Sequence, residues 1–252
     1  MQVLPADIIK LLFDYLDAGS FCNFIATCKR FLELAKEKKI IKKLDYSLQQ
    51  RDCWDWAVKY QHTDIVVCLL WLLEDHGKPL VKYIGILLDK SIDYSSYKIV
   101  KYLLNRKLLH TGDITEERLR KIINKGDLEM FTLLHESFKD RNYNTAWKFA
   151  LEKSRLGIVN YLHKTIGMKI TVGEITSIIN RTHYALLEYV IDNFKLTTNQ
   201  RIELLKSTIK NNATQPFKIM MEKFPKLSKN KKLELISLCL VKTGQIYRIL
   251  NQ

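Results

Sequence analysis

Cysteine has the widest chemistry of any residue type in this chain, since a thiol can form disulfides, bind metals or act as a nucleophile. The 252 residues contain an odd number of cysteines without any Cys-x-x-Cys pair, namely Cys22, Cys28, Cys53, Cys68 and Cys239. This pattern argues against a disulfide framework and against a zinc knuckle. We therefore expect buried or incidental thiols and no metal site.

Histidines and paired carboxylates are the other candidates for acid–base chemistry. His135 and His163 fall at equivalent positions of a sequence repeat, as duplicated packing residues would, and no His-Glu-x-x-His spacing occurs. The pairs Glu74–Asp75 and Glu116–Glu117 stand at expected helix ends, where the helix dipole and solvent explain them. No Gly-x-Ser-x-Gly motif and no glycine-rich phosphate loop is present. The sequence predicts no enzyme, no catalytic residue and no cofactor.

Positive charge is the unusual feature of the composition. The chain has 41 Lys and Arg against 27 Asp and Glu, a formal net charge of +14. Eleven basic and three acidic residues follow from Arg201 to the end, and a second basic stretch runs from Lys29 to Lys43. Such an excess attracts nucleic acid or an acidic protein surface. Because lysines spread over helix faces dominate it, we favour a solvated surface over nucleic-acid binding.

The chain has the composition of a folded protein without a membrane span. Hydrophobic residues make up 47% of it. The apolar run from Ile65 to Leu73 is closed by Glu74 and Asp75, well short of the roughly 18 residues that a span requires. Asp7 stands where a signal peptide needs apolar residues. We expect no membrane partner and an intracellular location, in the cytoplasm or the nucleus.

The segment from Trp56 to Leu73 supplies a pattern that recurs along the chain. A helix-compatible segment ends in a small or apolar residue, a polar break follows, and a second helix begins with Ile-Val-x-x-Leu-Leu. The comparable anchor residues are 34, 31, 28, 28, 30 and 30 positions apart, namely Ile65, Ile99, Met130, Ile158, Leu186, Pro216 and Ile246. A near-constant period of this length is typical of stacked helical repeats. The sequence predicts six to seven repeats over residues 50–252.

These repeats resemble ankyrin repeats. The resemblance lies in the join between the two helices, in AVKYQHTDIVVCLL from Ala57, IINKGDLEMFTLL from Ile122, ALEKSRLGIVNYL from Ala150 and INRTHYALLEYV from Ile179. The Thr-Pro-Leu-His signature of the family is absent, so HEAT-type or other helical-pair arrays remain the alternative fold. With nine glycines in the chain, we expect distorted turns between the helices. We also expect residues 93–96 to bulge from the turn of the second repeat.

Residues 1–45 do not fit the repeat. A Leu-Pro start is followed by two amphipathic segments and by Cys-Lys-Arg-Phe. This spacing resembles an F-box, whose pattern is matched by Leu4, Pro5, Ile8, Leu12, Leu16, Phe24, Cys28, Lys29, Arg30, Phe31 and Leu34. The resemblance implies docking onto the Skp-type linker subunit of a cullin ubiquitin ligase through Leu4, Pro5, Ile8, Leu12, Leu16, Phe24, Cys28 and Phe31. The alternative is that these helices only cap the first repeat.

The expected fold is therefore all-α, with a short N-terminal F-box-like module and an ankyrin-like solenoid of helical pairs. This design is similar to that of adaptors that recruit a target protein to a ubiquitin ligase. Degenerate repeats rich in Lys and Ile behind such a segment resemble proteins encoded by giant DNA viruses, which implies a host cell as the location. A plain ankyrin scaffold without a ligase link is the alternative function, and a basic nucleic-acid-binding surface is a third. One sequence does not identify the target protein.

Overall fold

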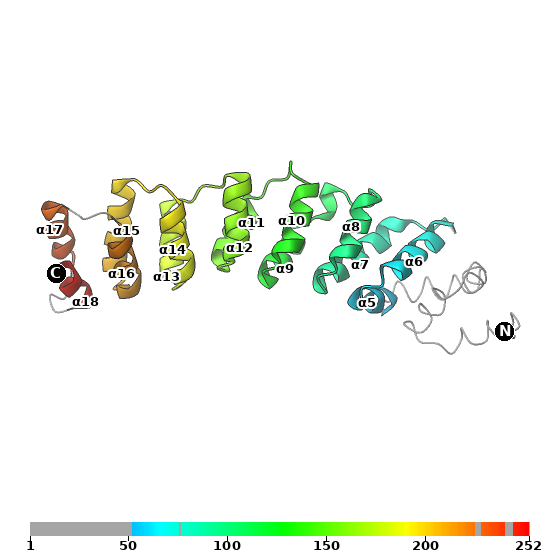
Figure 1. Cartoon of the computed structure of the whole chain (residues 1–252), viewed down its shortest axis with the longest axis horizontal. Helices are drawn as coiled ribbons and strands as arrows, with labels where there is room; N and C mark the ends of the chain where they lie inside the picture. Colours follow the sequence, from blue (N-terminus) through cyan, green and yellow to red (C-terminus); the bar gives the residue numbers. More distant parts are fainter. Residues whose placement is uncertain (1–51, 76, 225–227, 240–243, 252) are drawn as a thin grey trace, which may run out of the picture. The chain divides into compact units, whose positions relative to one another are not determined.

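The described part of the chain is built from helices that come in pairs (Figure 1). The structure is a computed structural model, and it describes residues 52–75, 77–224, 228–239 and 244–251. The first helices of the pairs are α5 (Asp52–Lys59), α7 (Leu80–Asp93), α9 (Glu116–Lys125), α11 (Asn144–Glu152), α13 (Val172–Asn180), α15 (Thr198–Lys210) and α17 (Lys229–Ser237). The second helices are α6 (Thr63–Asp75), α8 (Tyr97–Asn105), α10 (Leu128–Ser137), α12 (Leu156–Tyr161), α14 (Tyr184–Asn193), α16 (Thr214–Lys223) and α18 (Gln245–Asn251). A 3₁₀ turn (η1, Thr111–Asp113) precedes α9, and a π turn (η2, Leu162–Ile166) extends α12.

The second helix of each pair begins where the repeated anchor predicts. The anchor is the third residue of α6, α8, α10, α12, α14 and α16, and the second residue of α18. All seven anchors are buried, including Pro216, which lies in the first turn of α16 where a proline is tolerated. In all but the last pair, the residue after the anchor and the fourth residue after it are also buried, as Val66 and Leu69 are in α6. The predicted starts of the second helices are confirmed.

The turn inside each pair keeps one backbone geometry wherever it is described in full. The residue four positions before the anchor has a left-handed conformation with φ between 50° and 73° in Gln61, Ser95, Gly126, Ser154, Thr182 and Asn212. Its N–H bonds to the carbonyl three residues earlier, and the next N–H bonds to the carbonyl five residues earlier, as from Ser154 to Leu151 and from Arg155 to Ala150. This is the Schellman arrangement that ends many helices.

Two expectations about these turns are wrong. The turns are not distorted by the scarcity of glycine, because polar residues take the left-handed position in five of the six. Residues 93–96 do not bulge either, since Ser95 has the same conformation as its counterparts. The longer second repeat instead contains a longer first helix, because α7 has 14 residues where α9, α11 and α13 have nine or ten.

Several first helices begin directly after a threonine that caps them. Thr171 and Thr197 accept hydrogen bonds from the backbone N–H of Glu174 and Gln200, whose side chains bond back to the threonine N–H. These are capping boxes, in which two N–H groups at the helix start are satisfied reciprocally. The Thr115 hydroxyl likewise accepts from the Arg118 N–H at 3.3 Å at the start of α9.

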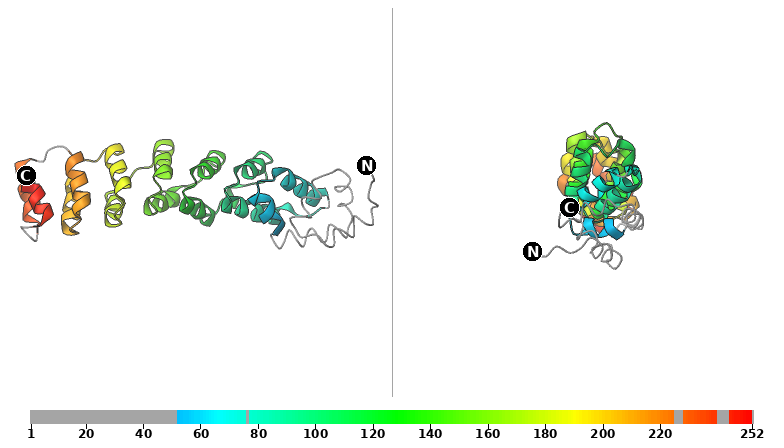
Figure 2. Two further views of the ribbon diagram at one scale, coloured as in Figure 1. Left: turned by 60° about the horizontal axis from the view of Figure 1, so that its bottom comes forward. Right: turned by 90° about the vertical axis from the view of Figure 1, so that its right-hand side faces the viewer.

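The chain divides into two compact units, one of residues 1–122 and 127–141 and one of residues 123–126 and 142–252. In the first unit, α5 packs on α7, while α6 packs on α8 and α8 on α10. In the second unit, α11, α13, α15 and α17 pack in order, and so do α12, α14, α16 and α18. Each unit thus has one row of first helices and one row of second helices, which Figure 2 shows from two further directions.

Side chains of one pair cap the helix end of the pair before it. The Ser96 hydroxyl donates to the Val58 carbonyl at 2.8 Å, and the Arg155 guanidinium donates to the Ile123 carbonyl at 3.1 Å. Ser96 and Arg155 occupy the same repeat position, and so do the two carbonyls that accept. Each of these two carbonyls also accepts the N–H of its own turn, so the side-chain bonds add a second donor and tie Val58 and Ile123 to the adjacent pairs.

Arg118 forms a further tie within the first unit. Its side chain, largely buried, joins α9 to α7 by donating to both carboxylate oxygens of Asp89 at 2.8 and 3.1 Å and to the Gly85 carbonyl at 3.1 Å. A bidentate pair of this kind is stronger and more directional than an ordinary exposed ion pair. It therefore fixes how the first helices of adjacent pairs align.

The turn geometry makes a prediction about stability. Thr182 has a φ of 59°, and this left-handed conformation is especially unfavourable for a β-branched residue. Thr182→Gly should raise the free energy of opening α13 and α14 by about 0.5–1 kcal/mol, measured by amide hydrogen exchange of these helices. As the opposite control, Gly126→Ala should lower the stability of its own turn by about 1 kcal/mol. Faster exchange in Thr182→Gly would contradict the left-handed assignment.

Candidate functional site

The paired carboxylates that could do acid–base chemistry lie at the ends of helices. No group of three or more His, Cys, Asp or Glu comes together as a metal site among the residues that the structure describes. Glu116 and Glu117 occupy the first turn of α9, and Glu74 lies near the end of α6 at 3.8 Å from Arg106. These are the helix-end positions that the sequence predicts for the paired carboxylates.

The two histidines of equivalent repeat position are packing residues. His135 is buried in α10, and burial lowers its pKa. The His163 ring lies 4.0 Å from the Phe194 ring, measured between centroids, and its Nδ1 is 2.9 Å from the Met168 carbonyl oxygen. Cys239 is a free, half-buried thiol whose pKa is raised by burial. Both histidine rings thus lie within the packed helical pairs, as duplicated packing residues would.

The predicted ligase-docking residues lie outside the described residues. They are Leu4, Pro5, Ile8, Leu12, Leu16, Phe24, Cys28 and Phe31. Their assignment as a binding surface stays a prediction from the sequence. The grooves described next are formed by the helical pairs.

An open groove of about 740 Å³ lies between α8 and α10 in the first unit. Its lining combines apolar side chains with charges, and the residues are Tyr97, Lys98, Lys101, Leu128, Glu129, Thr132, Leu133 and Glu136. The exposed lysines belong to α8 and the exposed glutamates to α10, so the two walls have opposite charge. Leu128 is 40% exposed at the start of α10. Apolar side chains between charged walls suit a segment of another protein that has both apolar and charged residues.

Asp127 holds the end of this groove together. Its carboxylate accepts hydrogen bonds from the Ser95 hydroxyl at 2.6 Å, from the Tyr97 hydroxyl at 3.0 Å and from the Met130 N–H at 3.0 Å. The last of these bonds caps α10, while the other two reach back to the start of α8. Burial and the hydrogen bond to Asp127 raise the pKa of Tyr97. One carboxylate thus positions both walls of the groove.

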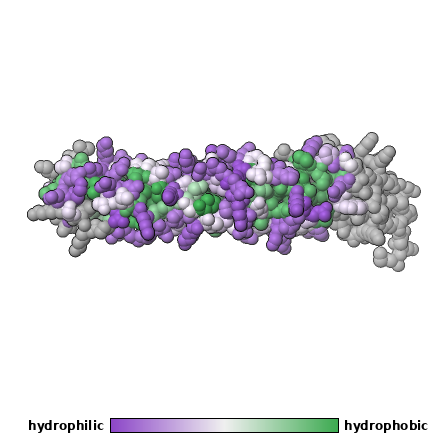
Figure 3. All heavy atoms as spheres, turned by 90° about the horizontal axis from the view of Figure 1, so that it is seen from above, coloured by the Kyte–Doolittle hydropathy of each residue, from purple (hydrophilic) through white to green (hydrophobic). Residues whose placement is uncertain are grey.

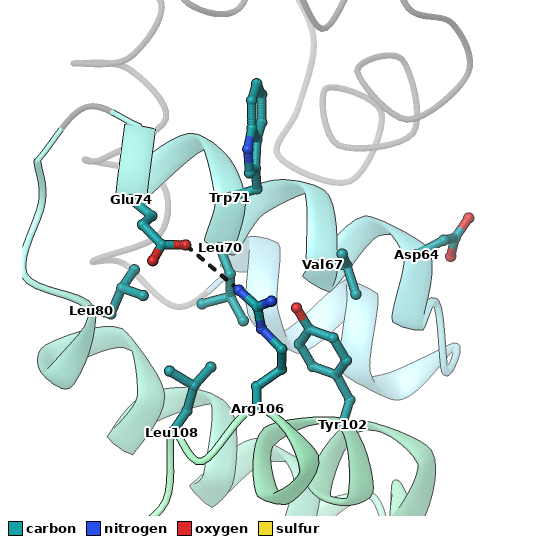
Figure 4. A pocket seen from close by; sticks show the side chains of 9 residues that line it. All are labelled: Asp64, Val67, Leu70, Trp71, Glu74, Leu80, Tyr102, Arg106 and Leu108. Atoms are coloured by element: carbon teal, nitrogen blue, oxygen red, sulfur yellow. Dashed lines mark ion pairs between the residues drawn. The ribbon is translucent and has the colours of Figure 1, made fainter.

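A second groove of about 320 Å³ lies between α6 and α8 (Figure 4). Val67 and Leu70 of α6 face Tyr102 of α8 and Arg106, the residue after α8, and the exposed Arg106 pairs with Glu74. An exposed pair of this kind contributes at most about 1 kcal/mol, so it closes the groove only loosely. Trp71 also lines this groove, and 40% of its surface is exposed.

Some of the described lysines lie at helix ends or in ion pairs. Lys59 and Lys125 lie in the last turns of first helices, where the helix dipole favours cations. Lys206 and Lys223 pair with carboxylates of neighbouring pairs at 2.6 and 2.8 Å. One face of both units shows mostly hydrophilic side chains with apolar patches between them (Figure 3). The described surface therefore presents mixed chemistry, which favours protein partners over a nucleic-acid backbone.

Comparison with known families decides the nature of the N-terminal segment. Residues 1–43 match the family model of the F-box domain. The N-terminal segment is an F-box domain. F-box domains bind Skp1-type subunits of cullin ligases, and proteins that contain them are typically adaptors and not enzymes. No curated protein and no solved structure matches the chain.

The architecture is all-helical in the described residues and has an F-box at its N-terminus. None of the described helices is long and apolar enough to cross a membrane. The division of the chain into residues 1–45 and 50–252 stays a prediction. In the first unit, α6 and α8 line one of the two grooves, and α8 and α10 line the other.

Sequence reasoning missed the groove between α8 and α10. Its residues come from two repeats, and Tyr97 and Asp127 are 30 positions apart in the chain. One signal was available, because Leu128 and Leu156 are apolar at the same repeat position and both are exposed, by 40% and 38%. An apolar residue that recurs outside the buried positions of a repeat indicates a surface role.

The Asp127 network gives a second prediction. Asp127→Ala removes the cap of α10 and leaves two hydroxyls without their shared acceptor, which should lower the free energy of unfolding by about 1–2 kcal/mol. Asp127→Asn keeps a capping oxygen and should lose less than half as much. Urea unfolding of the two variants, with hydrogen exchange of α10, measures the difference. Equal stability of Asp127→Ala and the parent protein would show that the network does not hold the groove.

Proposed function

We propose that this protein is an adaptor that brings a target protein to a cullin-type ubiquitin ligase. The match of residues 1–43 to the F-box domain carries the proposal, since that domain binds Skp1-type subunits. The helical pairs that follow are the part of the chain that holds the target. Binding is then the whole activity of the protein, which acts inside the cell, in the cytoplasm or nucleus, and in a host cell if the chain is viral.

We further propose that the helical pairs form an ankyrin-like array. The support is the recurrence of one turn geometry, of one set of buried positions and of side-chain caps between adjacent pairs. Each pair buries part of its apolar surface only against its neighbours, as in repeat proteins whose exposed faces serve for binding. The absence of the Thr-Pro-Leu-His signature leaves other helical-pair arrays as the alternative architecture.

We place target binding at the groove between α8 and α10. Leu128 offers an exposed apolar contact there, and Lys101 and Glu136 offer opposite charges on the two walls. A target segment that fits would be amphipathic, with acidic residues toward α8 and basic residues toward α10. A plain scaffold without a ligase link would use the same groove. The two functions therefore differ only in whether the F-box domain binds a Skp1-type subunit.

The ligase link is tested by one charge substitution in the F-box. Leu12→Asp should weaken binding to a purified Skp1-type subunit by about 2–4 kcal/mol, or roughly 30- to 1000-fold, because an apolar interface residue is replaced by a charge. Lys10→Asp, on the expected polar face of the same segment, should bind as the parent does. Affinity is measured by calorimetry, and circular dichroism shows that both variants fold. Undiminished binding by a folded Leu12→Asp variant would reject the adaptor proposal.

The target groove is tested by a pair of variants at one repeat position. Leu128→Glu should remove target proteins from those recovered with the tagged protein, while binding of the Skp1-type subunit is retained. Leu156→Glu, with nearly the same exposure in the second unit, should leave recovery unchanged. Quantitative mass spectrometry of the three samples measures the difference. If Leu156→Glu loses the same proteins and Leu128→Glu does not, the target lies elsewhere.

A further inference from the structure

The groove between α8 and α10 runs along the axes of these two helices. On α10 its lining residues occupy the first, second, fifth, sixth and ninth positions, from Leu128 to Glu136. On α8 they occupy the first, second and fifth positions, from Tyr97 to Lys101. Since a helix rises about 1.5 Å per residue, the α10 wall is about 12 Å long, or slightly more than two turns. A segment that fills the groove therefore lies along its walls.

The walls of the groove present side chains and no backbone edge. Both walls are α-helices, whose backbone groups between the ends are bonded within the helix, and no strand occurs among the described residues. The N–H of Met130, in the first turn of α10, is taken by the Asp127 carboxylate. An extended segment in this groove would have backbone groups facing apolar side chains without partners, which costs free energy. A helix satisfies its own backbone groups and presents only side chains.

The charges on the two walls have different spacings. Lys98 and Lys101 are three residues apart on α8, while Glu129 and Glu136 are seven residues apart on α10. All four side chains are exposed. In the part of the chain that the structure describes, no ion pair joins one wall to the other. These charges can therefore be complemented by a bound partner.

We propose that the target segment held in this groove is an amphipathic α-helix with acidic residues on the flank that faces α8 and basic residues on the flank that faces α10. A docked helix has the same rise per residue as the helices beside it, so its charges recur at the spacing of the walls. Its acidic residues are then about three or four positions apart and its basic residues about seven. Leu128 and the half-buried Leu133 contact its apolar stripe. This inference rests on the proposed placement of target binding at the groove.

The test uses two peptide libraries displayed on phage and selected against the full-length chain. In the first library, Asp, Lys, Leu and Ala vary on the exposed face of a stable helical scaffold. In the second, the same residues vary in a peptide with a proline at every fourth position, which prevents a helix. Sequences that also bind Leu128→Glu are discarded. Only the helical library should be enriched, and the enriched helices should have the two charge spacings on opposite flanks of an apolar stripe.

A charge exchange on the protein then tests the two flanks. Lys101→Glu combined with Glu136→Lys keeps the net charge and should weaken binding of an enriched helix about tenfold or more. The same peptide with its charged residues replaced by Gln should be insensitive to this exchange. The control is Lys218→Glu combined with Glu222→Lys, at the same repeat positions and also exposed in the second unit, which should leave the affinity unchanged. Fluorescence anisotropy measures the affinities, and circular dichroism shows that each variant folds.

The possible failures can be told apart. Enrichment of the proline library that is lost in a folded Leu128→Glu variant would overturn the helical form and leave the groove as the target site. Equal affinity of the exchanged and parent proteins for the enriched helix would overturn the assignment of the flanks. Enrichment from neither library would overturn the placement of the target at the groove as well. Loss of binding to the Skp1-type subunit in Leu12→Asp reports on the ligase link alone.

Discussion

Every described helical pair has more apolar surface than its two short helices can cover between them. The nine residues of α13 and the ten of α14 are too few to be stable as isolated helices in water. Their buried residues become covered only when α11 and α12 lie on one side and α15 and α16 on the other. Stability therefore depends on contacts between neighbours, as it does in linear repeat proteins.

The turn inside each pair sets how its two helices are arranged. Its two hydrogen bonds and one left-handed residue fix where the second helix starts, and hence which of its faces meets the first helix. Side chains such as Ser96 and Arg155 then reach the helix end of the preceding pair from a constant repeat position. Local turn geometry and contacts between pairs thus support the same arrangement.

The sequence predicts the buried side of this arrangement well because burial leaves a local periodic pattern. The anchors from Ile65 to Ile246 mark the second helices correctly, and Thr171 and Thr197 mark two first helices through their capping boxes. Turn geometry was mispredicted because the left-handed conformation was equated with glycine, whereas the hydrogen bonds of the turn hold Gln61 and Thr182 in it as well. Propensity is a weak guide where surrounding contacts determine the backbone.

One candidate site could be predicted from the sequence and the other could not. The F-box was predicted because its residues fall within 43 contiguous positions with a characteristic spacing. The groove between α8 and α10 was not, because its walls come from different repeats and Asp127 joins them through Ser95 and Tyr97. In the sequence, Asp127 before α10 predicts only an ordinary N-terminal helix cap. Its second role exists only once the two pairs are packed.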